Sequence, residues 1–438
     1  MSELPKPYVV ERVPIESLKP DPQNARTHSK RQIRQIAASI KEFGFNNPIL
    51  VDKGGKIIAG HGRWEAGKLN GLTHVPTIRL EHLTPDQLRA YVLADNRLAE
   101  KAGWDVSILA IELQQLLNTE LNFDVSITGF EAPEIDLILG DASGQSDEDD
   151  EIATGEGLPV VTRPGDVWHA GRHIVACANA LDQHSYDLIL GGARADVVFT
   201  DPPYNVPING HVSGKGRIRH REFPMASGEM GEGQFAEFLA RGCTLLAANS
   251  REGSIHYVCM DWAHADLMHQ AGKAYSTLKN ICVWIKGNGG MGSLYRSQHE
   301  FIFVFKNGGA PHTNNVQLGK FGRNRTNVWN YPSPVGFGRA GEEGHLAALH
   351  PTVKPVSLIA DALVDCSARD DIVLDPFLGS GSTLIAAERV GRKCRGMDLD
   401  PLYIDVAIRR WQRHSGDCAV HAETGRRFDE LAEDRADG

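Results

Sequence analysis

One stretch near the end of the chain, DIVLDPFLGSGSTLIAAERVGRKCRGMDLDP at 371–401, constrains the fold most strongly. It predicts a strand at 372–374, a glycine turn at 379–382, a helix from Thr383, and a second strand that ends at Asp398. Glycine lets the backbone approach a ligand closely, and an acid after the second strand can accept hydrogen bonds from both ribose hydroxyls. A plain helix cap would explain the turn alone, whereas the complete order is typical of a nucleoside-binding βαβ unit.

The acid that ends the first strand, Asp375, restricts the ligand. Dinucleotide sites carry a GxGxxG turn and place a pyrophosphate at the helix N-terminus, where a carboxylate would repel it. The turn here departs from GxGxxG, and a carboxylate beside it suits a cation or an ammonium group. S-adenosyl-L-methionine carries a sulfonium, an α-amino group and a ribose but no phosphate, so we predict it as the cofactor.

The region around this unit alternates apolar strand-like runs with helical patterns. We expect strands at 196–200, 254–260, 281–286, 300–305, 372–375 and 394–398, and helices at 234–248, 356–367 and 382–391. Such alternation is typical of an α/β fold with an open, mostly parallel sheet.

The strand expected at 196–200 ends in the unusual sequence TDPPYN, residues 200–205. Neither proline can donate a backbone hydrogen bond, so the sheet ladder stops there. The exocyclic amino group of a base is a poor nucleophile because its lone pair is delocalised into the ring. The Asp201 carboxylate and the Pro202 carbonyl could accept its hydrogens, Pro203 would help to fix the carbonyl, and Tyr204 could stack on an extruded base. A strand that merely ends in a Pro-Pro turn explains neither the acid nor the aromatic ring.

The motifs DPPY, DPFLGSGST and GMDLD, in this order, resemble the amino-methylating DNA methyltransferases, in the permuted beta order of that family. The resemblance covers about residues 158–415 and implies a Rossmann-like, S-adenosylmethionine-dependent sheet in which the strands bearing DPPY and the glycine turn are neighbours. It implies N6 of adenine in double-stranded DNA as the methyl acceptor, because enzymes acting on N4 of cytosine more often begin the motif with Ser. N4 of cytosine stays the nearest alternative, and a ParB-like DNA-binding or partition protein is a third.

The resemblance also implies the site residues. HIVACANALD (173–182) places Asn179 where the family has an acid near the adenine of the cofactor, and HPTVKPVSL (350–358) resembles the segment that closes over its methionine end. The implied catalytic residues are Asp201, Pro202, Pro203 and Tyr204. The implied cofactor-binding residues are Asp375, Pro376, Phe377, Gly379, Ser380, Gly381, Thr383, Asp398, Asn179, Lys354 and Pro355.

Two further segments are candidates for DNA contact. The stretch 214–221 has four basic residues among glycines, which suits a loop that grips phosphates, although a solvated loop is the alternative. The segment at about 309–349, which includes Trp329, lies where this family has its target-recognition region. The predicted DNA-binding residues are Lys215, Arg217, Arg219, Arg221, Lys320, Arg323 and Arg325.

The N-terminal part predicts a smaller α+β domain. A helix is expected at 30–43, strands at 48–52 and 56–60, a glycine turn into a helix at 60–71, and helices at 84–99 and 107–118. The pieces IESLKPDPQNART (15–27), NPILVD…GKIIAGHGRWEAGK (47–68) and LADNRL (93–98) resemble the ParB/sulfiredoxin-like domain. That resemblance implies nucleotide contact at Gly60, His61, Gly62 and Arg63, although the Glu of the family's Gly-Glu-Arg-Arg element is missing. Residues 1–176 contain no cysteine, which excludes sulfiredoxin chemistry.

Composition completes the predicted organisation. We expect a ParB-like domain at 8–105, a helical extension at 106–140, an acidic linker at 141–157, a methyltransferase domain at 158–418 and an acidic tail at 419–438. The net charge is −10, and the linker alone has seven acids and no base. The seven cysteines are scattered without a CxxC pair, so we expect free thiols and no metal. We expect a cytoplasmic protein without a membrane segment, and the sequence leaves open both a homodimer and a restriction partner.

Overall fold

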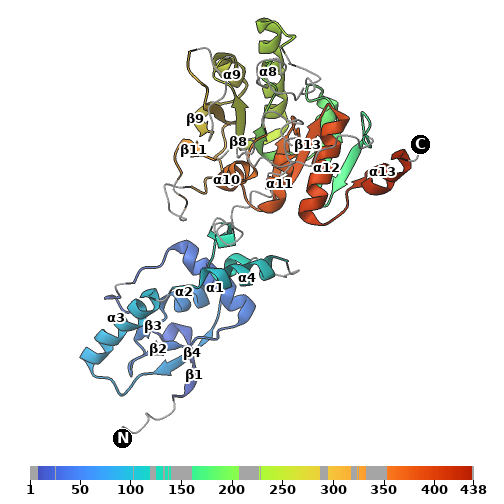
Figure 1. Ribbon diagram of the computed structural model, residues 1–438. Helices are drawn as coiled ribbons and strands as arrows, with labels where there is room; N and C mark the ends of the chain where they lie inside the picture. Colours follow the sequence, from blue (N-terminus) through green and yellow to red (C-terminus); the bar gives the residue numbers. More distant parts are fainter. Residues whose placement is uncertain are drawn as a thin grey trace, which may run out of the picture. The chain divides into compact units, whose positions relative to one another are not determined.

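The structure is a computed structural model that describes residues 8–24, 26–101, 103–118, 125–131, 134–136, 138–139, 160–206, 226, 228–286, 294–316, 323, 325–331 and 353–436. The chain forms two compact units, Met1–Ala142 and Ser143–Gly438 (Figure 1). The acidic linker expected at 141–157 lies outside the described residues. Within the described part of the chain, no helix is both long enough and apolar enough to cross a membrane.

The first unit is built on a four-stranded sheet with the order β1-β4-β2-β3. Buried Ile49, Ile57 and Val75 fill its core, and α1 packs its apolar face, with Ile33 and Ala37, near α2. The elements are β1 (Val10–Pro14), η1 (Ile15–Ser17), α1 (Lys30–Phe43), β2 (Ile49–Val51), β3 (Ile57–Ala59), α2 (His61–Leu69), β4 (His74–Arg79), α3 (Pro85–Lys101), α4 (Val106–Asn118) and η2 (Val125–Thr128).

The predicted helix at 30–43 is confirmed residue for residue, and its ends show why. The Ser29 hydroxyl accepts a hydrogen bond from the backbone N–H of Gln32, which caps the first turn. Gly44 ends the helix with φ of +86°, a conformation that favours glycine. The strand pair and the other helices expected in this unit are also confirmed, whereas β1 and β4 were not predicted.

The second unit contains a ten-stranded sheet with the order β11-β9-β10-β8-β7-β12-β13-β6-β5-β14. Its strands are β5 (Val167–Ala170), β6 (His173–Cys177), β7 (Ala195–Thr200), β8 (Ser250–Met260), β9 (Thr277–Ile285), β10 (His299–Lys306), β11 (Val328–Asn330), β12 (Ile372–Asp375), β13 (Lys393–Asp398) and β14 (Val420–His421). Its helices are α6 (Gln183–Leu190), α8 (Glu232–Ala248), α9 (Ala265–Ala271), η4 (Gly272–Ala274), α10 (Val356–Cys366), α11 (Ser382–Arg389), α12 (Pro401–Ser415) and α13 (Phe428–Ala436).

The central strands β8, β7, β12, β13 and β6 are parallel, as the alternating pattern predicts. Antiparallel pairs flank them, because β10 runs against β8 and β9, and β5 runs against β6. The sheet is therefore mixed at its sides and parallel at its centre.

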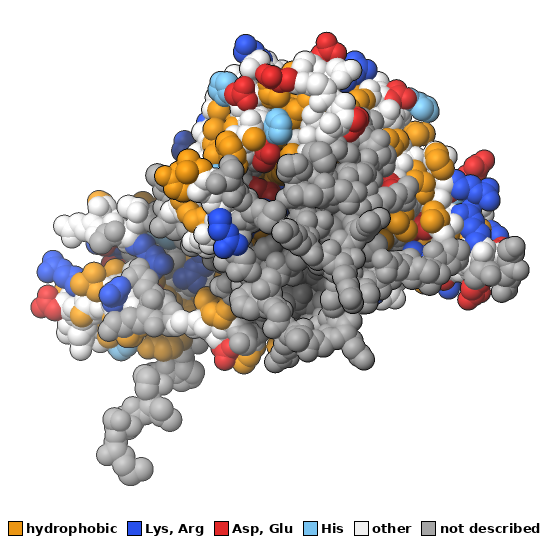
Figure 2. All heavy atoms as spheres, turned by 45° about the horizontal axis from the view of Figure 1, so that its top comes forward, with side chains coloured by type: hydrophobic (Ala, Val, Ile, Leu, Met, Phe, Trp, Pro, Cys, Tyr) orange, Lys and Arg blue, Asp and Glu red, His pale blue; other side chains and the backbone are white. Residues whose placement is uncertain are grey.

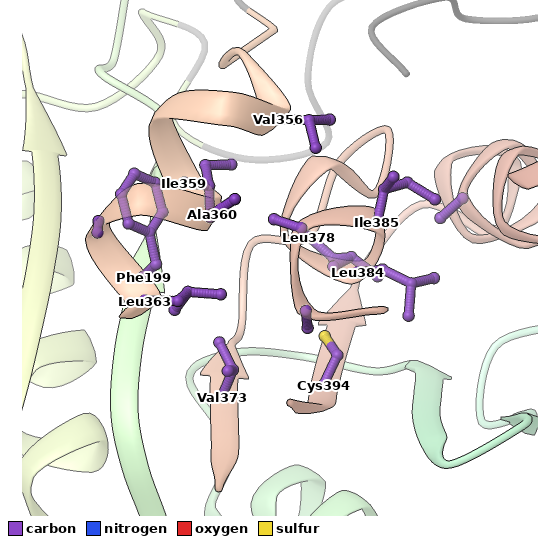
Figure 3. Packing of buried hydrophobic residues seen from close by; sticks show 14 of the residues in the cluster. Phe199, Val356, Ile359, Ala360, Leu363, Val373, Leu378, Leu384, Ile385 and Cys394 are labelled. Carbon is purple, nitrogen blue, oxygen red and sulfur yellow. The ribbon is translucent and has the colours of Figure 1, made fainter. Parts of the chain in front are cut away.

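Both faces of the central strands are covered, which explains their continuous apolar runs. Phe199 and Val373 face α10 and α11, where they pack with Ile359 and Leu363 (Figure 3). Alternate residues of the same strands, such as Val198 and Leu374, belong to a separate cluster with residues of α6 and α8. The core thus holds β7 and β12 in place from both sides.

The C-terminal segment 419–438 differs from the acidic tail that its composition predicts. It contains β14 and α13, and the Phe428 ring is fully buried with its centroid 5.2 Å from that of Trp168. The acids of the segment, including Glu430 and Glu433, occupy exposed positions. The many acids of this segment therefore reflect its exposed face. They do not reveal that Phe428 packs the segment on the core.

Replacement of this anchor tests the observation. Phe428→Ala should lower the free energy of unfolding of the second unit by about 3–5 kcal/mol, because it leaves a cavity under α13. Urea denaturation followed by circular dichroism measures the change, and Glu433→Ala, an exposed position on the same helix, should alter it little. Equal stability of Phe428→Ala and the wild type would mean that the segment does not pack on the core.

Candidate active site

The strands that carry the two main motifs are direct neighbours. β7 and β12 pair in parallel, with Val197 opposite Val373, which confirms the adjacency implied by the family resemblance. β13 and β6 follow on the far side of β12, also in parallel. The carboxyl ends of β7, β12, β13 and β6 therefore meet at one edge of the sheet, the usual position of a ligand site in open α/β folds.

A buried hydrogen bond joins the two motifs at this edge. The Thr200 hydroxyl, one residue before Asp201, lies 2.8 Å from Oδ1 of Asp375. The same carboxylate accepts the backbone N–H of Phe377 at 3.1 Å and a hydrogen bond from the Thr383 hydroxyl. Burial raises the pKa of Asp375 to about 7, and these hydrogen bonds oppose the shift. Asp375 therefore holds the turn in place through these hydrogen bonds. The sequence had suggested only a contact with a cationic ligand.

The glycine turn packs closely against α12. Gly381 has φ of +86°, and a Cβ atom added there would lie 2.8 Å from the Cβ of Ala407. The Ser380 carbonyl and hydroxyl lie 3.3 and 3.4 Å from Nη1 of Arg410, so Ser380 contacts the protein interior. Only glycine allows this turn to pack so closely.

Asp398 and Asn179 complete the edge. Asp398 is half-buried and accepts the backbone N–H groups of Gly379 at 3.0 Å and Asp400 at 2.9 Å. Burial raises its pKa to about 6. Asn179, which follows β6, uses Oδ1 to accept the N–H of Leu181 at 2.9 Å. Carboxylates and an amide at the strand ends suit ribose hydroxyls, an adenine amino group and an ammonium group, so these residues fit S-adenosyl-L-methionine.

The DPPY motif lies beside a cluster of buried charges. Asp201 accepts a hydrogen bond from the Tyr204 hydroxyl at 2.6 Å on Oδ1 and from the Lys354 ammonium at 2.5 Å on Oδ2. The same ammonium lies 2.9 Å from Oε2 of Glu300, whose other oxygen accepts a hydrogen bond from Lys286. Each carboxylate of this cluster therefore contacts at least one ammonium group.

These contacts set the protonation states. Burial raises the pKa of Asp201, while the Lys354 ammonium opposes the shift. Burial also disfavours the charge on Glu300, but Lys354 and Lys286 overcome this and lower its pKa to about 2. Burial would lower the pKa of Lys354, but Asp201 and Glu300 instead raise it well above its ordinary value. The Lys354 ammonium and the Glu300 carboxylate therefore stabilise each other's charged forms.

Two members of this cluster, Glu300 and Lys286, were not predicted from the sequence. The only signal for Glu300 is an acid inside the apolar run HEFIFVF at 299–305, where a buried charge needs a partner. Lys354 was predicted to bind the cofactor, and its ammonium group contacts Asp201 and Glu300. Cofactor contact at this residue stays a prediction. Pro355, next to it, is buried and precedes the first turn of α10.

The predicted DNA-binding arginines require a correction. Arg323 is buried and lies 2.7 Å from Asp365, while Arg325 contacts both Asp365 and Asp361 at 3.0 Å. Trp329 is also buried and lies beneath Arg325. This part of the predicted target-recognition region is therefore bound to α10, and these two arginines are paired within the protein.

The other predicted DNA-binding residues, Lys215, Arg217, Arg219, Arg221 and Lys320, lie outside the described residues. On the described parts of the face in Figure 2, basic and acidic side chains are interspersed. The described surface on that face is thus of mixed charge.

The structure brings the four N-terminal candidates together. Gly60, His61, Gly62 and Arg63 line a cavity of about 240 Å³ at the start of α2. Two of these side chains already have partners, because His61 accepts the N–H of Asp21 at 3.0 Å and Arg63 donates to the Asn47 carbonyl at 3.1 Å. Nucleotide contact at this cavity stays a prediction.

Comparison with known families agrees with this geometry. The model of a DNA methylase family, N6_N4_Mtase, matches residues 195–409. A ParB N-terminal domain matches residues 3–96, and a ParB-methyltransferase HTH domain matches residues 107–164. The chain therefore carries a methylase domain of the N6/N4 DNA methylase family at residues 195–409, preceded by ParB-type domains.

Individual relatives cover parts of the chain. A ParB-like nuclease domain-containing protein of Escherichia coli K12, YnaK, is 49% identical over 74 residues, which are 17% of this chain and 85% of the relative. The type II methyltransferase M.ScaI of Streptomyces caespitosus is 35% identical over 95 residues, 22% of this chain and 31% of its own. The solved PvuII DNA methyltransferase, described as cytosine-N4-specific, is 13% identical and covers 64% of this chain and 95% of its own, with a TM-score of 0.42.

The second unit thus contains a DNA methyltransferase domain of the N6/N4 family, whose members use S-adenosylmethionine. This unit has a Rossmann-like α/β methyltransferase fold, and the first unit is a small ParB-like domain.

Because the pKa of Asp398 is raised, we expect the affinity for the cofactor to depend on pH. The ionised carboxylate is the better acceptor for ribose hydroxyls, so affinity for S-adenosyl-L-methionine should fall as the pH drops below about 6, approaching tenfold per unit. Asp398→Asn should weaken binding about 10- to 100-fold at pH 7.5 and remove this dependence.

Isothermal titration calorimetry between pH 5 and 8 measures both effects. The exposed variant Asp187→Asn serves as the control and should bind like the wild type. An affinity that stays constant across this range in the wild type would contradict the assignment of Asp398 to the ribose.

Proposed function

We propose that the chain methylates N6 of adenine in double-stranded DNA. The observation that carries this proposal is the position of Asp201. Its carboxylate lies at the end of β7, next to the β12 strand that leads into the glycine turn, and retains partial exposure with 20% of its side-chain surface accessible. An acceptor at this place can bind an amino group beside the site that fits the methyl donor.

The residues of the DPPY motif would prepare the amino group for attack. Asp201 and the Pro202 carbonyl would accept its two hydrogens and thereby direct the nitrogen lone pair away from the ring. The Tyr204 ring would stack on the extruded base while its hydroxyl holds Asp201 in orientation. S-adenosyl-L-methionine, when bound, supplies the electrophilic methyl group. Asp398, Asn179 and the backbone of the glycine turn would hold it.

Adenine is favoured over cytosine on one feature. The motif begins with Asp rather than the Ser that enzymes acting on N4 of cytosine more often have, and N4 of cytosine is therefore the alternative acceptor. A ParB-like DNA-binding or partition protein without methyl transfer would not need the intact DPPY motif or the glycine turn. The ParB-type domains are consistent with a module that positions the enzyme on DNA.

Expression in a host without DNA methylation tests the proposal. Sequencing of the host DNA with modification detection should show methylated adenine at a recurring short motif. Asp201→Ala should lower this methylation at least about a hundredfold, because it removes the acceptor for the amino group.

The exposed Asp187→Ala variant removes the same charge on α6 and should methylate like the wild type. Unmodified DNA from cells that contain soluble, cofactor-binding wild-type protein would refute the proposed function. Methylated cytosine in place of adenine would establish the alternative.

A further inference from the structure

The Lys354 ammonium occupies the carboxylate that a target amino group would need. It lies 2.5 Å from Oδ2 of Asp201, and the Tyr204 hydroxyl takes Oδ1. An amino group that binds Asp201 must therefore share this carboxylate with Lys354, or the Lys354 ammonium must move off the carboxylate. The Lys354 side chain is only 3% exposed, so withdrawal into water is not open to it.

Glu300 offers the ammonium a second place. Its Oε2 lies 2.9 Å from the Lys354 Nζ atom, and its side chain is 6% exposed. The opposite oxygen accepts a hydrogen bond from Lys286, which fixes the carboxylate on β10. A lysine ammonium has three donors, so Lys354 can keep its bond to Glu300 while it gives up the one to Asp201.

Charge explains why the second carboxylate is needed. A buried ammonium left without a counter-charge is strongly disfavoured, so a lysine paired with Asp201 alone would remain there. With Glu300 present, the ammonium stays paired whichever carboxylate it leaves. The Trp284 ring, 5.7 Å from Nζ of Lys354, keeps the ammonium within this cluster.

We propose that Glu300 is a positioning residue for methyl transfer: it holds Lys354 beside Asp201 and takes over its charge when the amino group of the target base binds the Asp201 carboxylate. The inference rests on the proposed function. It adds a role for a residue that acts through Lys354, and the Oε2 atom of Glu300 also lies 3.3 Å from the Tyr204 hydroxyl.

A set of near-isosteric variants tests this role. Glu300→Gln should confine Lys354 to Asp201 and lower kcat about 10- to 100-fold. The double variant Glu300→Gln/Lys354→Met no longer has an ammonium on Asp201, so it should be more active than Glu300→Gln. Glu300→Asp keeps the counter-charge and should retain more activity than Glu300→Gln. A residue needed only for stability would make the double variant equal to or worse than the single one.

A second readout needs no methyl transfer. Loss of the negative Glu300 should lower the pKa of Asp201, and Lys354→Met should raise it, because the positive neighbour is removed. The carboxyl titration of Asp201, followed by carbon NMR on the free protein labelled at aspartate, measures both shifts. The groups that act on Asp201 are Lys354, Glu300, Tyr204, Cys259 and Asp375, and Lys286 contacts Glu300.

The outcomes separate the two proposals. Opposite shifts of the Asp201 titration together with recovery in the double variant support the role of Glu300. An Asp201 pKa that does not change in the variants would overturn this role. A double variant that is folded, as thermal melting shows, but does not recover activity would overturn it as well. If the wild type methylates no DNA, the proposed function fails, and with it the positioning role in methyl transfer, even where the NMR shifts confirm the charge arrangement.

Discussion

The hydrogen bond between the Thr200 hydroxyl and the Asp375 carboxylate joins two motifs that are 175 residues apart in the chain. Because β7 and β12 are paired and covered on both faces, this contact is formed in a dry environment where an unpaired carboxylate would be costly. The close packing of Gly381 on Ala407 keeps the following turn at the same edge. The proposed sites for the methyl donor and the methyl acceptor therefore depend on one shared junction.

Charge is balanced at two places around α10. At its start, Lys354 connects Asp201 and Glu300, and along its length Asp361 and Asp365 hold Arg323 and Arg325. The first cluster is partly open at Asp201, and the second joins buried Arg323 and Asp365 to Asp361, whose side chain is 36% exposed. The same kinds of residues thus lie beside the proposed catalytic motif at one place and bind the predicted target-recognition region to α10 at the other.

Most of the fold at the site could be predicted from sequence, because strand runs, glycine turns and terminal acids leave local signals. The helix at 30–43 and the neighbouring β7 and β12 strands are examples. The partners of buried charges could not be predicted, because Glu300 and Lys286 reach Lys354 and Asp201 only through the fold. The same limit affected Arg323 and Arg325, whose basic character suggested DNA contact, and Phe428, whose acidic neighbours suggested an acidic tail.

The proposed function depends most on which atom of the DNA receives the methyl group. The decisive measurement incubates the purified protein and deuterium-labelled S-adenosyl-L-methionine with DNA from a methylation-free host, and then identifies the labelled nucleoside by mass spectrometry. We expect the label in N6-methyl-2′-deoxyadenosine. Label found only in N4-methyl-2′-deoxycytidine, or in no nucleoside at all, would contradict the proposed function.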